Sequence, residues 1–171
     1  MKAGRAFTLV ELIVVMVIVA IMAAVAVPAF SNSGSSRAAV AARMISRDLA
    51  YARERAIATG TRTWVVFSPG TQSYSVLAED PTNPGRANAS PLNDPLNNGK
   101  RYIEYLNSGE LVGITLTGAT FDSGTEIGFD WVGKPYNSGS TLLSAAGTVT
   151  LSAGGYTVTV QPATGLAKVT P

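Results

Sequence analysis

The sequence has neither cysteine nor histidine among its 171 residues. Without cysteine there is no disulfide framework, and cysteine usage says nothing about the redox compartment. Without histidine the protein lacks the commonest general base, the commonest transition-metal ligand and the usual pH switch. Because no Ser–His or Cys–His arrangement can be built, we predict a protein that is not an enzyme and that uses no cofactor.

The net charge is small, and its distribution is more informative than its total of +2. Lys2 and Arg5 precede a long apolar run. Residues 31–62 hold six arginines against two acids, whereas residues 63–171 hold five basic residues against eight acids. The basicity is therefore local. It indicates either a solvated helix face or a strip that contacts nucleic acid or an acidic partner subunit.

The apolar run covers nineteen uncharged residues, Leu12–Phe30, and directly follows Glu11. A helix over this run would be roughly 28 Å long, about one hydrocarbon thickness. The preceding basic residues predict a cytoplasmic N-terminus with the rest of the chain across the membrane. The run is typical of a single-span anchor, and the alternative is a secretory signal cleaved near Ala24-Val25-Ala26.

Neither interpretation explains Glu11. A carboxylate at the bilayer boundary costs on the order of a few kcal/mol unless it finds a partner. No basic residue lies between Phe7 and Ser36, so the partner must come from outside this segment.

The stretch Gly4-Arg5-Ala6-Phe7-Thr8-Leu9-Val10-Glu11, followed by the apolar run with Pro28 near its end, resembles the leader of type IV pilins and type II secretion pseudopilins. The resemblance implies cleavage between Ala6 and Phe7 by a prepilin peptidase, N-methylation of Phe7, and Glu11 as the fifth residue of the mature chain. The family most often has glycine where this chain has Ala6. The implied partners are other pilin or pseudopilin subunits, the peptidase and inner-membrane lipid.

Cleavage before Phe7 would create an ammonium group at membrane depth, where it also lacks a partner. The ammonium of one subunit and Glu11 of its neighbour would then neutralise each other and fix the register of adjacent helices. We therefore predict that Glu11 forms an intersubunit ion pair.

The next segment, residues 31–60, is predicted to continue the helix into a soluble domain. Pro28 should kink the helix, and the polar residues 31–36 favour a hinge or break. Helical periodicity is strong over Arg37–Thr59, and Gly60 suits a C-terminal cap. The apolar stripe comprises Ala38, Ala41, Ala42, Ile45, Leu49, Ala52, Ala56 and Ile57. The charged residues that fall mostly off this stripe, and that we expect to be solvated, are Arg43, Arg47, Asp48, Glu54 and Arg55.

From residue 61 the period changes to two, which predicts a periplasmic antiparallel β domain over residues 61–171 and an α+β fold class. A hairpin is predicted around Ser68-Pro69-Gly70-Thr71. Residues 79–100 contain four prolines and predict a long loop that is either fixed or, through its oxygen ligands, able to hold calcium. Further strands are expected at 101–105, 111–116, 126–131, 148–151, 156–161 and 166–169. The segments are therefore a leader (1–6), a transmembrane helix (7–30), an amphipathic helix (31–60) and the β domain.

Within the pilin superfamily, Asp48-Leu49-Ala50-Tyr51-Ala52-Arg53 and the closing Pro162-Ala163-Thr164-Gly165 resemble the GspH/FimT group of minor pilins and pseudopilins. The resemblance implies a structural subunit of a type II secretion pseudopilus or a type IV pilus, anchored in the inner membrane. The alternative is a DNA-binding minor pilin for natural transformation, which in that group carries a basic Gly-Arg-x-Arg motif near its C-terminus. This chain has Gly165-Leu166-Ala167-Lys168 instead. The candidate contacts for DNA or a partner are Arg37, Arg43, Arg47 and Lys168.

Overall fold

The computed structural model describes residues 8–31, 33–97 and 99–171, and it leaves out the side chains of residues 25–31 and 33. The predicted cleavage and methylation positions, Ala6 and Phe7, therefore lie outside the described residues. The chain divides into two compact units, Met1–Ser33 and Gly34–Pro171. We describe each unit by itself.

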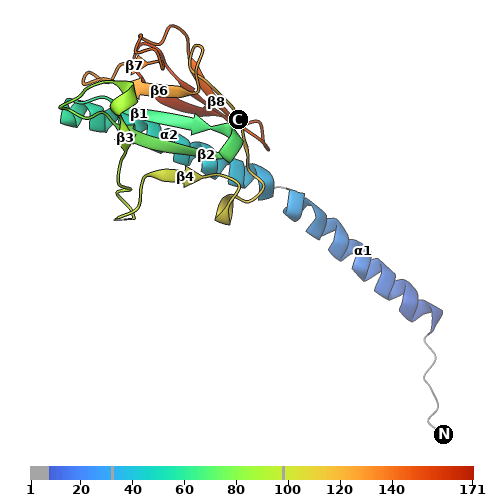
Figure 1. The fold of residues 1–171 in the computed structure, drawn as a ribbon. Helices are drawn as coiled ribbons and strands as arrows, with labels where there is room; N and C mark the ends of the chain where they lie inside the picture. Colours follow the sequence, from blue (N-terminus) through green and yellow to red (C-terminus); the bar gives the residue numbers. More distant parts are fainter. Residues whose placement is uncertain (1–7, 32, 98) are drawn as a thin grey trace. The chain divides into compact units, whose positions relative to one another are not determined.

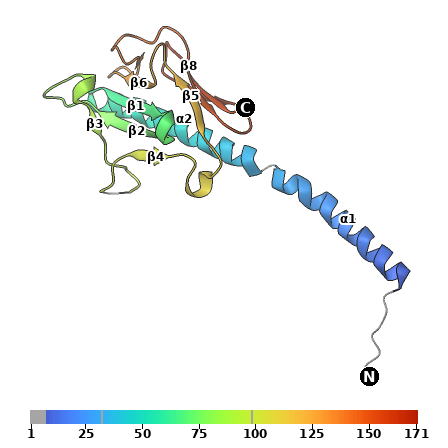
Figure 2. The same ribbon diagram turned by 45° about the vertical axis from the view of Figure 1, so that its right-hand side comes forward.

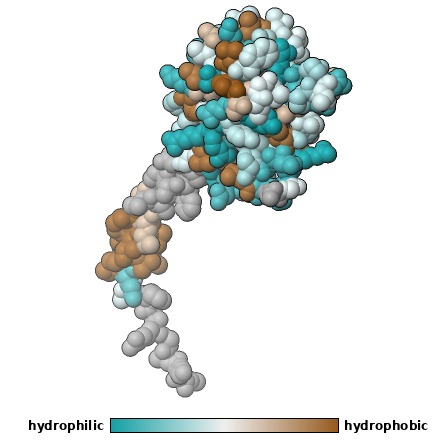
Figure 3. All heavy atoms as spheres, turned by 90° about the vertical axis from the view of Figure 1, so that its left-hand side faces the viewer, coloured by the Kyte–Doolittle hydropathy of each residue, from teal (hydrophilic) through white to brown (hydrophobic). Residues whose placement is uncertain are grey.

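The first unit contains helix α1, Leu9–Ser31. Thr8 begins the helix, since its hydroxyl accepts a hydrogen bond from the Glu11 amide (3.3 Å) and its carbonyl accepts one from Leu12 (3.2 Å). Every large apolar side chain from Leu9 to Met22 is at least 50% exposed within the described unit. In Figure 3 most of the coloured part of α1 is accordingly brown. Among the residues that the structure describes, no helix combines the length and the hydropathy needed to cross a membrane.

The second unit is built around helix α2, Ser33–Thr59. The amphipathic helix predicted over residues 31–60 is observed at Ser33–Thr59, and the polar residues 33–36, where a hinge or break was expected, are helical. Gly60, with φ of +68°, ends the helix and donates its amide to the Ala56 carbonyl at 3.0 Å. The predicted apolar stripe is confirmed, apart from Ile57, which is 44% exposed. Its seven fully buried members are Ala38, Ala41, Ala42, Ile45, Leu49, Ala52 and Ala56.

Two antiparallel sheets accompany α2. The first has the order β3-β2-β1-β6-β7, with β4 also paired to β2, and the second has the order β10-β9-β8-β5. In the first sheet the strands are β1 (Thr63–Ser68), β2 (Ser73–Ala78), β3 (Ser90–Pro91), β4 (Ile103–Tyr105), β6 (Glu126–Phe129) and β7 (Pro135–Tyr136). In the second sheet they are β5 (Leu116–Thr120), β8 (Gly147–Leu151), β9 (Thr157–Val160) and β10 (Ala167–Thr170).

The core lies between α2 and the inner faces of these sheets. Figures 1 and 2 both show α2 running alongside β1 and β2. Side chains such as Phe67 and Val76 from the first sheet and Val158 from the second share one buried cluster with the α2 stripe. Complete burial of Ile45 and Leu49 stabilises the fold by roughly 1.5–3 kcal/mol each. The α+β class, with a helix packed on antiparallel sheets, is therefore confirmed.

The hairpin around residues 68–71 is also confirmed, since β1 and β2 pair from Thr63↔Ala78 to Ser68↔Ser73. The strand predicted at 111–116 is wrong. That segment holds a 3-10 turn, η3 (Gly109–Leu111), and the strand β5 begins only at Leu116. Gly113 has a φ of +89°, a left-handed conformation that a continuous strand does not accommodate.

The proline-rich loop at 79–100 is held against the outer face of the first sheet. Arg86 donates two hydrogen bonds to Glu126 Oε2, from Nε at 2.9 Å and from Nη2 at 2.6 Å. The same guanidinium lies 5.7 Å from the ring centroid of Trp64, which is fully buried. These contacts fix the loop, as the proline content predicted.

Candidate assembly surfaces

Glu11 lies in the first turn of α1, where the helix dipole favours a negative charge. It is exposed, and within the described residues it forms no ion pair. The carboxylate is therefore available to a group outside the unit. Its predicted partner, the ammonium at Phe7 of a neighbouring subunit, remains a prediction.

Pro28 lies inside α1, which continues in helical conformation to Ser31. Proline removes one backbone donor from a helix interior, and its ring crowds the preceding turn. The helix does not end at this residue. The kink predicted there remains a prediction, because the side chains of this part of α1 are outside the description.

The four basic side chains predicted to contact DNA or a partner lie in different surroundings. Arg37 donates from Nη1 to the carbonyl of Val112 at 3.1 Å, and Arg47 is paired with Asp48. Arg43 lies exposed one turn before Arg47 on α2, whereas Lys168 lies exposed on β10, at the end of the second sheet. Two of the three arginines are thus already engaged within the chain, and the one lysine belongs to another element.

The main correction concerns Asp48, which we expected to be solvated. Its side chain is only 1% exposed. Oδ1 accepts a hydrogen bond from Arg47 Nε at 2.9 Å, and Oδ2 accepts one from the hydroxyl of Tyr74 at 2.6 Å. Asp48 lies three residues after Ile45 and four before Ala52, so the apolar stripe itself carries this carboxylate inward.

The buried carboxylate changes the electrostatics around it. Burial raises the pKa of Tyr74 well above its usual range, and the charge of Asp48 raises it further. Burial and then Asp48 likewise raise the pKa of Tyr102. The hydrogen bond to Asp48 raises the pKa of Arg47. Both phenols therefore stay protonated, and the Arg47 guanidinium keeps its charge.

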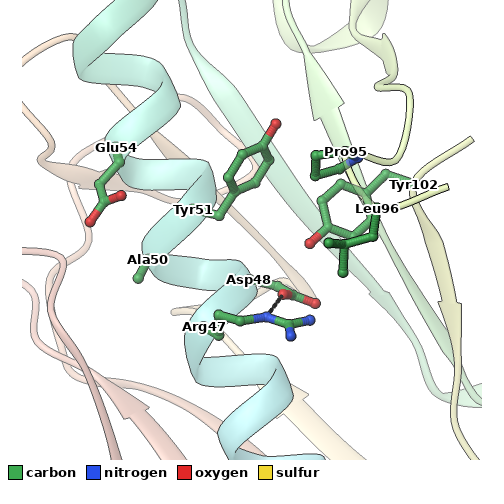
Figure 4. Close-up of a pocket in the computed structure, with 8 residues that line it drawn as sticks. All are labelled: Arg47, Asp48, Ala50, Tyr51, Glu54, Pro95, Leu96 and Tyr102. Carbon is green, nitrogen blue, oxygen red and sulfur yellow. Dashed lines mark hydrogen bonds and ion pairs between the residues drawn. The ribbon is translucent and has the colours of Figure 1, made fainter. Parts of the chain in front are cut away.

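A pocket of about 360 Å³ opens beside this carboxylate. Figure 4 shows Arg47, Asp48 and Tyr51 of α2 on the side that faces Tyr102 and Leu96, whereas Glu54 points away from them. The lining residues are Arg47, Asp48, Ala50, Tyr51, Glu54, Pro95, Leu96 and Tyr102. Sequence reasoning missed this pocket because its two sides are more than forty residues apart in the chain.

Two acidic side chains outside this pocket, Asp122 and Asp130, organise turns. Asp130 Oδ1 accepts the amides of Val132 (2.9 Å) and Lys134 (2.8 Å), and Asp122 accepts the Ser144 hydroxyl at 2.6 Å. In the described ranges no group of three acidic side chains is arranged to hold a metal ion. These carboxylates have a structural role in the turns that they close.

The fold is that of a minor pseudopilin. It matches a structure of the minor pseudopilin EpsH from the Type 2 Secretion System of Vibrio cholerae, with a TM-score of 0.55 and 14% identity over 78% of this chain and 96% of that chain. A crystal structure of the same pseudopilin matches with a TM-score of 0.56 and 15% identity, over 80% of this chain and 97% of that one. No match was found among curated proteins.

The sequence is more specific about the family. Residues 1–27 match the prokaryotic N-terminal methylation motif, and residues 41–164 match the type II transport protein GspH. The chain belongs to the type II transport protein GspH family. This result confirms the GspH-like resemblance and does not favour the DNA-binding alternative.

Proposed function

We propose that this chain is a minor pseudopilin, a structural subunit of a type II secretion pseudopilus. The observation that carries the proposal is the presence, in one chain, of the methylation motif at residues 1–27 and the GspH domain at residues 41–164. Its role is assembly rather than catalysis, in keeping with the absence of histidine and cysteine.

In this proposal a prepilin peptidase cuts between Ala6 and Phe7, and Phe7 is then methylated. Residues 7–30 anchor the subunit in the inner membrane as a single span, with the second unit in the periplasm. The support comes from the sequence, which has no charged residue from Leu12 to Ser36 and two basic residues before Phe7.

The first test is the mature N-terminus, read by mass spectrometry of the protein isolated from its host. We expect a chain that begins with methylated Phe7. A chain that begins near Val27 would contradict the proposal, because the leader would then be an ordinary secretory signal.

The second test concerns Glu11, which we propose pairs with the Phe7 ammonium of a neighbouring subunit. Glu11→Val should leave the amount of protein in the membrane unchanged but lower its incorporation into filaments by at least about tenfold, the factor that 1.4 kcal/mol produces. Glu110→Gln is the matched control, since it removes an exposed carboxylate that does not line the pocket beside Asp48. Normal incorporation of Glu11→Val would refute the pairing.

A further inference from the structure

The turn between β8 and β9 lies against the first residues of α2. It contains three consecutive residues in the left-handed region, Ala153, Gly154 and Gly155, with φ of +62°, +66° and +66°. Glycine adopts this region freely, whereas it strains an alanine. A methyl group on Gly154 would lie 3.3 Å from Cα of Ser35. One on Gly34 would lie 3.8 Å from Cβ of Ala153, so a strained turn is in close contact with the start of a helix.

A second turn contacts the same end of α2 and is tied to the first. Arg37 donates from Nη1 to the carbonyl of Val112 at 3.1 Å, in the segment that joins η3 to β5. In the same segment, Thr115 donates its amide to Oγ of Ser152 at 2.7 Å, and its carbonyl accepts the Ser152 amide at 2.8 Å. Residues 112–115 and 152–155 therefore form one connected clamp on the helix.

The part of α2 that the clamp contacts, which we call the helix start (residues 34–40), has little stability of its own. It begins with Gly-Ser-Ser, three weak helix formers. Among the described side chains of α2, those buried before Ile45 are alanines, at positions 38, 41 and 42. An alanine removes far less apolar area from water than an isoleucine or leucine does. Without the clamp, the helix start would have few contacts to keep it helical.

We propose that the clamp is releasable, so that the helix start opens and closes as one local unit while the rest of the domain stays folded. The contacts of the clamp favour the closed state, and relaxation of the strained Ala153 favours the open one. In the open state the domain holds α2 only from Ala41 onward, so the anchored helix is shorter by roughly two turns. The inference goes beyond the proposed function, because it concerns the single subunit and requires no neighbour.

A disulfide across the contact tests the proposal on the full-length chain in detergent micelles. The 3.8 Å between the methyl positions of residues 34 and 153 is the usual Cβ–Cβ distance of a disulfide, and the chain has no cysteine of its own. In Gly34→Cys/Ala153→Cys, hydrogen–deuterium exchange of the helix start is measured by mass spectrometry, with residues 45–52 as the reference segment. In the reduced protein the helix start should exchange at least about tenfold faster than the reference segment, and oxidation should slow it by about tenfold or more.

Two alanine substitutions in the β8–β9 turn form a matched pair. Gly154 and Gly155 have the same φ of +66°, but a methyl group on Gly155 meets nothing within 4 Å, whereas one on Gly154 crowds Ser35. Gly154→Ala should therefore speed exchange of the helix start at least about fivefold more than Gly155→Ala does, with the reference segment unchanged in both.

A third substitution should act in the opposite direction. Gly34→Ala places its methyl group at an ordinary contact distance from Ala153 and replaces glycine by a better helix former. It should therefore slow exchange of the helix start by about fivefold.

Three results would overturn the proposal. If the helix start exchanges as slowly as the reference segment, it does not open separately. If the cysteine pair cannot be oxidised, or if oxidation leaves exchange of the helix start unchanged, the clamp does not control the opening. If Gly154→Ala and Gly155→Ala have equal effects, strain within the turn is responsible rather than its contact with the helix.

Discussion

Replacing Tyr74 by phenylalanine is the sharpest test of the buried carboxylate. Tyr74 is 1% exposed, and its hydroxyl donates to Asp48 Oδ2 over 2.6 Å. Phenylalanine keeps the ring, which packs 5.5 Å from the ring of Phe67, and removes only the hydroxyl. The substitution therefore isolates one hydrogen bond to a buried charge.

The expected loss of stability follows from the contacts that Asp48 keeps after the substitution. Asp48 keeps its bond to Arg47 and its interaction with Tyr102, but Oδ2 loses the Tyr74 hydroxyl in a buried place. A hydrogen bond to a charged group contributes about 1.5–3 kcal/mol, and an unsatisfied buried acceptor costs an amount of the same order. We expect the free energy of unfolding of Tyr74→Phe to be lower by about 2–3 kcal/mol near neutral pH.

The pH dependence gives the prediction a second, independent signature. Burial and Asp48 raise the pKa of Tyr74, so the native state keeps the phenolic proton at pH values where the unfolded chain, with a pKa of about 10, has lost it. The stabilisation is complete below pH 10 and falls above it by about 1.4 kcal/mol per pH unit. Phenylalanine has no such proton. The difference between the two proteins should therefore shrink steadily from pH 10 towards pH 12.

The assay is urea unfolding of the full-length chain in detergent, followed by tryptophan fluorescence, to which the buried Trp64 contributes. Tyr105→Phe is the matched control. It also removes a phenolic hydroxyl, but Tyr105 on β4 is 58% exposed. It should change stability by less than about 0.5 kcal/mol. A Tyr74→Phe protein as stable as the wild type, or a difference that stays constant up to pH 12, would refute the reasoning.

Two further predictions concern contacts that join separate parts of the domain. The side chain of Gln72 accepts a hydrogen bond from the Leu116 amide at 2.6 Å and donates one to the Leu116 carbonyl at 3.3 Å, so it links the β1–β2 turn to the second sheet. Gln72→Ala should therefore lower the free energy of unfolding by about 1–3 kcal/mol in the same urea assay. Arg86→Gln should free the loop at 79–100 from Glu126 and lower stability by about 1–2 kcal/mol. Limited proteolysis should then cleave this loop faster than in the wild type, and an unchanged cleavage rate would contradict the fixed-loop interpretation.

The fold could be predicted where the spacing of apolar residues fits only one type of secondary structure. The alanine-rich stripe of α2 recurs every three or four residues, and seven of its eight positions are fully buried. The stripe fails only at Ile57, in the last turn of the helix, where the side chain is 44% exposed. The segment 111–116 was ambiguous, because Leu111 and Ile114 are buried in a turn as completely as they would be in a strand. Hydrophobicity reports burial, and it cannot distinguish the two backbones.

The pocket could be predicted only in part. A carboxylate three residues after Ile45 is on the buried face by helical geometry, and that signal was present in the sequence. Its partner, Tyr74, is brought to it by the register of β2, and Tyr102 comes from beyond the proline-rich loop. Neither pairing leaves a local trace in the sequence. Sequence reasoning therefore could have found the buried charge but not the groups that satisfy it.

The small side chains of the α2 stripe connect the packing of this domain to its pocket. Five of the seven fully buried stripe residues are alanines, which let a helix approach a sheet more closely than leucine or isoleucine would. The buried face of the helix also carries Asp48, whose Oδ2 accepts a hydrogen bond from the Tyr74 hydroxyl at 2.6 Å. The outer side of the helix, from Arg43 through Arg47 and Ala50 to Glu54, is exposed to solvent. Helix α2 therefore supplies both the buried carboxylate beside the pocket and the exposed residues Arg47, Ala50 and Glu54 that line it.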